Sequence, residues 1–227
     1  MIKQKIKGEV YTLRKITNNL HRYIELATEQ DIEEGLNWYP EANEFCRVLA
    51  NKHGLTMQQV AGITAALSPQ VEWGQNKRWA EQFIASRGKG FMGNRDRTIK
   101  CKTILKLTDP EAIYSTLSTS DKGGNKTKAF YRNILEPNKD DVVTIDRHAI
   151  AACFFRPELC RPLSDKDSKL TYSQYNFLSD CFVSKAREVG MLATSFQAVL
   201  WITVRRIRGL MEPKGIVGFV PADIESF

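Results

Sequence analysis

Apolar residues recur at helical spacing along most of the chain. After Thr56, a typical N-cap residue, one face follows the i, i+3, i+4, i+7 rule at Val60, Ile63, Thr64 and Leu67. Pro69 should end this helix, because a proline cannot continue it. Similar spacing predicts further helices over residues 41–52, 76–85, 127–135, 173–189 and 196–207. The pattern therefore predicts a mainly α-helical fold.

Capping and loop signals complete the predicted order of elements. The segment 109–111, Asp-Pro-Glu, is a strong helix start, and Asp146 is placed to cap a further helix. Residues 156–172 contain two prolines and several polar side chains, which predicts a loop, and the chain after Gly209 is expected to be irregular. Apart from residues 141–145, little in the pattern favours strands.

Length and composition are those of a globular protein. The chain has 227 residues, of which 42% are hydrophobic and 26% charged, so it can bury one substantial core or two smaller ones that share a cleft. The longest nearly apolar run, residues 196–204, is far shorter than the roughly 20 residues that a membrane-spanning helix needs. The first ten residues have no apolar segment typical of a secretory signal. We therefore expect no contact with a membrane.

The five cysteines are odd in number and mostly lie in apolar stretches, which favours buried free thiols. Cys153 and Cys160 have the six-residue separation of one iron–sulfur pattern. No Cys-x-x-Cys follows, so too few thiolates are present to hold a cluster. The sequence predicts neither a metal site nor a cofactor.

Charge is distributed unevenly along the chain. The 33 basic and 26 acidic residues give a net charge of +7. Seven basic residues lie within residues 87–106 with a single acid, and four lie within 122–132 with none, whereas 28–44 carries six acids and no base. Such segregation indicates a basic face that contacts phosphates, although a solvated surface would have the same composition.

A glycine turn interrupts the predicted helices within residues 122–126. Gly123 and Gly124 allow positive φ and close approach of the backbone, and the free N–H groups of the following helix favour an anion. A helical hairpin can hold a DNA phosphate in this way. An ordinary turn between two helices would contain the same glycines.

Three segments occur in the order found in one enzyme superfamily. They are Leu67-Ser68-Pro69-Gln70, Gly124-Asn125-Lys126-Thr127 and Ile145-Asp146-Arg147-His148, with Lys126 and Asp146 twenty positions apart. In these segments the chain resembles the helix-hairpin-helix DNA glycosylase superfamily, which includes endonuclease III and oxoguanine glycosylase. Lys122 stands where that family has its first hairpin glycine.

The resemblance covers roughly residues 41–155 and implies a two-lobed helical fold with a cleft. The lobes would pack intimately as one unit, with residues 55–135 in the central lobe and residues 1–54 plus 136–227 in the second. Residues 37–40, 67–70, 130–134 and 197–198 also look like a divergent group of bacteriophage proteins. The expected protein is a monomer that binds double-stranded DNA in the cytoplasm of a bacterial or phage-infected host cell.

The resemblance also implies catalytic roles. A carboxylate at Asp146 would stabilise the positive charge that develops on the sugar when a glycosidic bond breaks. Lys126 would attack C1′ and form a Schiff base, giving strand cleavage by elimination. Lys128 lies eighteen residues before Asp146 and is the alternative nucleophile. The alternative explanation of Asp146 is that it serves only as an N-cap.

The remaining candidate residues would contact DNA. Gln70 is the candidate wedge for the gap left by a flipped base, and Trp73 would stack beside it. The other predicted DNA contacts are Asn76, Lys77, Gly123, Gly124, Asn125, Thr127, Lys128 and His148. Trp201, Arg205 and Arg208 share one helical stripe and fit either a DNA contact or an intramolecular cation–π pair.

The leading hypothesis is a DNA N-glycosylase that flips a modified or damaged base and cleaves its glycosidic bond, either with or without lyase activity at abasic sites. An enzyme that elaborates a base of phage DNA would use the same pocket together with a small cosubstrate. A DNA-binding module without turnover would keep only the hairpin.

Overall fold

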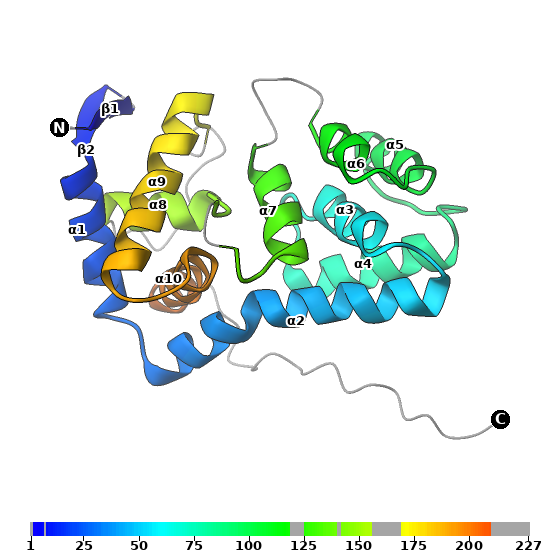
Figure 1. Ribbon diagram of the computed structural model, residues 1–227, viewed down its shortest axis with the longest axis horizontal. Helices are drawn as coiled ribbons and strands as arrows, with labels where there is room; N and C mark the ends of the chain where they lie inside the picture. Colours follow the sequence, from blue (N-terminus) through cyan, green and yellow to red (C-terminus); the bar gives the residue numbers. More distant parts are fainter. Residues whose placement is uncertain (1, 7, 119–124, 140–141, 156–168, 210–227) are drawn as a thin grey trace.

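The computed structural model confirms that the protein is mainly α-helical (Figure 1). The described part of the chain holds ten helices and one β-hairpin. None of the described helices has the length and apolar character needed to cross a bilayer. The structure describes residues 2–6, 8–118, 125–139, 142–155 and 169–209.

The hairpin was not expected from the sequence. Strands β1 (Lys3–Ile6) and β2 (Glu9–Thr12) pair antiparallel. Only Ile6 and Tyr11 are buried in it, so the apolar alternation that signals a strand is nearly absent. The prediction that only residues 141–145 favour a strand is wrong, since the described residues 142–145 are not in a strand either.

The hairpin packs with four helices around one cluster of buried apolar side chains. Its members include four large side chains that are fully buried, each with an exposure of 0%: Leu20, Tyr23, Phe182 and Phe196. This group contains α1 (Leu13–Ile24), α8 (Arg147–Phe154), α9 (Tyr172–Glu188) and α10 (Ala193–Ile207).

A second cluster of buried side chains lies among the other helices. It includes Ile63, Phe83, Ile104 and Ile113. The helices around it are α2 (Glu29–His53), α3 (Met57–Leu67), α4 (Trp73–Ala85), α5 (Arg95–Ile104), α6 (Pro110–Thr116) and α7 (Asn125–Leu135). The second half of α2 contributes to this core. The residues that form the core therefore begin before residue 55, where the central lobe was expected to start.

Helix α2 is about twice as long as the segment 41–52 that periodicity predicted. Thr28 and Asp31 form a capping box that starts it, and Pro40 lies inside it. Pro40 is exposed, so water can satisfy the carbonyl that loses its helical donor. The helix therefore continues through a residue that usually marks an end.

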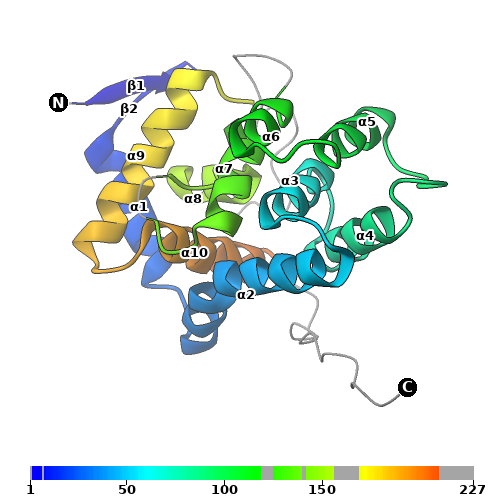
Figure 2. The same cartoon turned by 45° about the vertical axis from the view of Figure 1, so that its right-hand side comes forward.

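Helices α2 and α10 cross at very short range, and both views show them side by side (Figures 1 and 2). A Cβ at Gly35 would lie 2.6 Å from the backbone N and Cα of Val199. Glycine is therefore needed for the two backbones to approach this closely.

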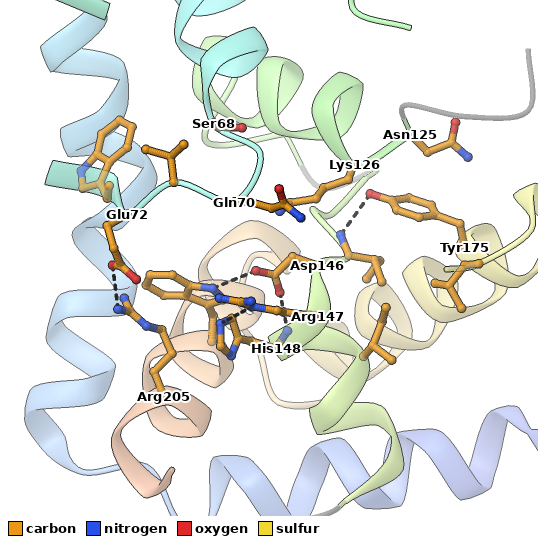
Figure 3. A pocket seen from close by; sticks show the side chains of 16 residues that line it. Ser68, Gln70, Glu72, Asn125, Lys126, Asp146, Arg147, His148, Tyr175 and Arg205 are labelled. Carbon is orange, nitrogen blue, oxygen red and sulfur yellow. Dashed lines mark hydrogen bonds and ion pairs between the residues drawn. The ribbon is translucent and has the colours of Figure 1, made fainter. Parts of the chain in front are cut away.

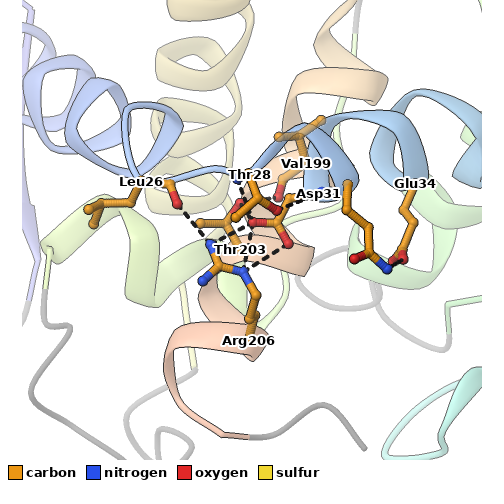
Figure 4. Close-up of polar contacts among 8 residues, drawn as sticks. Leu26, Thr28, Asp31, Glu34, Val199, Thr203 and Arg206 are labelled. Carbon is orange, nitrogen blue, oxygen red and sulfur yellow. Dashed lines mark hydrogen bonds and ion pairs between the residues drawn. The ribbon is translucent and has the colours of Figure 1, made fainter. Parts of the chain in front are cut away.

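An ion pair fastens the start of α2 to the end of α10 (Figure 4). The guanidinium of Arg206 donates to both oxygens of Asp31, at 2.6 to 3.0 Å, and to the carbonyl of Leu26 at 2.8 Å. Burial would raise the pKa of Asp31, but hydrogen bonds from Arg206 and Thr28 bring it below its usual value. The ionised pair therefore fixes α10 relative to α2.

Replacement of Gly35 tests the close approach of the two helices. Gly35→Ala should lower the free energy of unfolding by about 1–3 kcal/mol, because a methyl group has no room against Val199. Gly74→Ala in α4 is the matched control, since its nearest atom is the end of the Arg78 side chain at 3.9 Å. That control should leave stability unchanged or raise it by up to about 1 kcal/mol. Urea titrations followed by circular dichroism measure both, and equal effects would contradict the proposed contact.

Candidate active site

A cavity of about 340 Å³ opens where the starts of α4, α7 and α8 face α10 (Figure 3). Lys126 and Asp146 both line it, although one lies in α7 and the other precedes α8. The segment between α3 and α4 forms another wall, which includes Gln70. The other lining side chains include Ser68, Glu72, Trp73, Asn125, Arg147, His148, Tyr175, Trp201 and Arg205.

Asp146 caps α8 and also faces α10. Its Oδ1 accepts from the backbone N–H groups of His148 and Ala149, each at 2.9 Å. Its Oδ2 accepts from the indole Nε1 of Trp201 at 3.0 Å. The predicted N-cap is confirmed, and the same carboxylate lines the cavity. The capping role and a role in the cavity are therefore compatible.

The surroundings of Asp146 favour its ionised form. Burial would raise the pKa of this carboxyl, but positive charge on His148, the ammonium of Lys126 and the N–H groups of Ala149 and Trp201 bring it below its usual value. At neutral pH, where His148 is uncharged, Lys126 is the remaining cation of this set. Asp146 is thus ionised, and only weakly basic, at neutral pH.

His148 is buried beside Asp146 as a neutral ring. Burial lowers its pKa to about 4, with Arg147, Arg205 and Arg208 acting in the same direction against the opposing influence of Asp146. Its Nε2 accepts from Nε of Arg147 at 3.4 Å, which places the proton of the neutral ring on Nδ1. Buried Nδ1 has no hydrogen-bond partner in the described structure.

The two candidate lysines lie in different surroundings. Lys126 is half-buried in the cavity wall, whereas Lys128 is outside the lining and its ammonium lies 4.7 Å from the centre of the Tyr114 ring. Lys126 is therefore the lysine that the fold brings to the side of Asp146, and Lys128 instead makes a cation–π contact.

A smaller recess of about 100 Å³ adjoins the main cavity. The two share Ser68, Val71, Trp73, Lys126, Asp146 and Trp201 in their walls. Aromatic rings make up much of the recess: Trp38 lies 5.2 Å from Trp73 and 6.0 Å from Trp201, between ring centres. Lys126 and Asp146 therefore stand at the junction between an open cavity and an aromatic recess.

Buried polar groups hold the floor of the recess. The hydroxyl of Tyr39 lies 3.0 Å from both Thr144 Oγ1 and Gln197 Oε1. The amide of Asn133 is best placed with its nitrogen donating to two backbone carbonyls and its oxygen accepting from Thr144 at 3.2 Å. These contacts join α2, α7 and α10 to the segment before α8. They therefore fix the position of the chain just before Asp146.

The structure places the predicted DNA contacts in several different surroundings. Gln70 is exposed on the cavity rim with a φ of +60°, and Asn125 and Trp73 line the cavity. Asn76 is only 1% exposed and lines the recess. The ammonium of Lys77 lies 5.7 Å from the Trp73 ring centre, and Thr127 is half-buried outside both linings. Gly123 and Gly124, together with Lys122, lie outside the described residues.

Sequence reasoning missed much of the cavity rim. Arg205 lies 4.4 Å above the Trp201 ring and 2.9 Å from a carboxylate oxygen of Glu72, so the predicted cation–π pair is present. Helical spacing placed Trp201 and Arg205 on one stripe, but it gave no signal for Glu72 at the cavity or for Trp38 and Tyr39 at the recess. The positions of these three residues depend on contacts between helices.

Four of the predicted free cysteines are confirmed as buried thiols, and Cys160 lies outside the described residues. Among the residues that the structure describes, no group of three or more His, Cys, Asp or Glu side chains is arranged to hold a metal ion.

Residues 2–208 match the family of unknown function DUF7178, and the chain belongs to this family. Comparisons with curated proteins and with solved structures found no match in either.

The neutral state of His148 predicts a pH dependence of stability. The unfolded ring takes up a proton near pH 6.5, whereas the folded ring does so only near pH 4, so stability is lost as pH falls between these values. The free energy of unfolding should decrease by about 2 kcal/mol between pH 7 and pH 5. Urea titrations of wild type and His148→Gln at both pH values measure this decrease.

His148→Gln should largely abolish the decrease, whereas His21→Gln, at an exposed histidine, should retain it. A decrease that persists unchanged in His148→Gln would show that another group causes it.

Proposed function

We propose that this protein is a DNA glycosylase-like enzyme that flips a modified or damaged base and cleaves its glycosidic bond. The supporting observation is that Lys126 and Asp146 line one cavity that continues into an aromatic recess. A base in the recess would bring its sugar to the junction where the amine and the carboxylate stand. The proposal includes the two-lobed helix-hairpin-helix architecture and double-stranded DNA as the partner.

Asp146 suits an electrostatic role in this reaction. As the bond between C1′ and the base breaks, the sugar acquires oxocarbenium character. A carboxylate that is already ionised and held by three N–H groups needs no rearrangement to stabilise that charge. Its low pKa makes it a poor base, so the role we assign to it is charge stabilisation rather than proton removal.

Lys126 is the proposed nucleophile. Its ammonium would first give a proton to the departing base. The neutral amine would then attack C1′ as the base leaves with the electrons of the glycosidic bond, and ring opening gives a Schiff base. Elimination of the 3′ phosphate from this adduct would cleave the strand. Without such attack, water would replace the base and leave an abasic site.

Gln70 is the proposed wedge. Flipping a base costs a few kcal/mol, part of which is recovered when a side chain fills the gap in the stack. Gln70 has a left-handed backbone conformation that is rare outside glycine, and such strain is often retained at functional sites. Its place on the exposed cavity rim fits insertion into a duplex.

Base modification is the second candidate. The main cavity is more than three times as large as the recess, so it has room for a small cosubstrate beside a base. A product that retains a covalently altered base, instead of an abasic site, would favour this function.

Removing the charge of Asp146 tests the electrostatic role. An amide nitrogen at this position would oppose the indole N–H of Trp201, so Asp146→Asn is best compared within a Trp201→Phe background. On a panel of modified duplexes, the double variant should release base about 100-fold or more slowly than Trp201→Phe alone, with DNA binding retained. Equal rates of base release would exclude a catalytic role for the carboxylate.

Borohydride trapping tests Lys126 as nucleophile. Wild-type protein should form a covalent adduct with a substrate duplex, and Lys126→Ala should lose it because Lys126 is the one lysine that lines the cavity among the residues that the structure describes. Lys128→Ala is the matched control two residues away, and it should trap normally because its ammonium lies over Tyr114. Loss of the adduct only in Lys128→Ala would reverse the assignment.

A further inference from the structure

The shape of the recess limits what it can hold. Trp38 and Phe130 have ring centres 5.8 Å apart, and Trp73 and Trp201 complete an aromatic wall against which a flat ring can stack. An apolar protein cavity of about 150 Å³ accommodates benzene. At about 100 Å³, the recess is smaller than such a cavity, so it favours a single six-membered ring over a fused bicyclic system.

Asn76 lines the recess and has a buried acceptor without a partner in the described structure. Its Nδ2 donates to the carbonyl of Thr64 at 3.2 Å, which fixes the orientation of the amide. Its buried Oδ1 has no hydrogen-bond partner in the described structure. Leaving such an atom unpaired is unfavourable, so a ligand that donates a hydrogen bond to it would be favoured.

Gln197 supplies the complementary donor. Its Oε1 lies 3.0 Å from the hydroxyl of Tyr39, which turns Nε2 to the other side of the amide. No group of the described structure pairs with Nε2, and Gln197 also lines the recess. The recess therefore offers one acceptor and one donor beside a stacking surface.

We infer that the recess selects a pyrimidine base over a purine, with Asn76 and Gln197 determining specificity. This inference rests on the proposed function and names the class of base on which that function acts. A pyrimidine N–H donates to Asn76 Oδ1, and a ring nitrogen or carbonyl of the same base accepts from Gln197 Nε2. The aromatic rings hold its faces, and C1′ then lies at the junction with Lys126 and Asp146.

Binding of free deoxynucleosides tests the inference without requiring catalysis. Three of the four tryptophans line the recess, so occupancy should quench intrinsic fluorescence. Thymidine and deoxycytidine should bind about tenfold or more tightly than deoxyadenosine and deoxyguanosine. Equal or tighter binding of the purine nucleosides, or no quenching by any nucleoside, would overturn the inference.

Ligands without the donor test Asn76 in the wild-type protein. N3-methylthymidine and N4,N4-dimethyldeoxycytidine should each bind about tenfold more weakly than their parents, because the acceptor stays unpaired. In Asn76→Leu this difference in affinity should disappear. Gln197→Met should weaken the binding of both parent nucleosides. Asn43→Leu is the control, since Asn43 donates to the carbonyl of Ile134 and lies outside the recess lining.

If Asn76→Leu fails to fold, the wild-type comparison of methylated and parent nucleosides still decides the role of the acceptor. Equal affinity for both would show that the bound base does not donate to Asn76, and would overturn its assignment. Pyrimidine-selective binding without base release from any duplex would refute the proposed function and leave the selectivity of the recess intact. Base release confined to purines would refute the inference alone.

Discussion

The close packing of α10 against α2 determines where Trp201 and Gln197 lie beside the cavity and the recess. Glycine at position 35 lets the two backbones approach, and the ion pair between buried Asp31 and exposed Arg206 holds the ends together. Helix α10 carries Trp201 and Gln197, which therefore reach the carboxylate before α8 and the hydroxyl of Tyr39. A small change in this crossing would displace both contacts, because packed helices transmit shifts as rigid units.

The chemistry of the cavity follows from the fact that Asp146 is buried yet remains charged. Burying a carboxylate is costly unless hydrogen bonds and a nearby cation compensate. Here the helix start supplies two N–H groups, Trp201 supplies a third, and Lys126 supplies the charge. The same desolvation keeps His148 neutral, so the cavity combines a fixed negative charge with an uncharged ring.

Local signals predicted those parts of the protein that local physics controls. The N-caps at Thr56, Asp109 and Asp146 are present, because each needs only a side-chain oxygen and nearby N–H groups. The β-hairpin and the first half of α2 were missed because their local sequence lacks, or contradicts, the usual signal. The hairpin buries too few residues to alternate, and Pro40 normally ends a helix but here lies on an exposed face.

The sequence by itself determined the helical character, the cap at Asp146 and the shared helical stripe of Trp201 and Arg205, since helical spacing and short-range hydrogen bonds depend only on neighbours in the chain. Only the tertiary structure decided that Lys126 rather than Lys128 lines the cavity, and that Asn76 is buried beside an aromatic recess. Those outcomes depend on the angle at which helices cross, which packing between residues distant in the chain sets and periodicity does not encode.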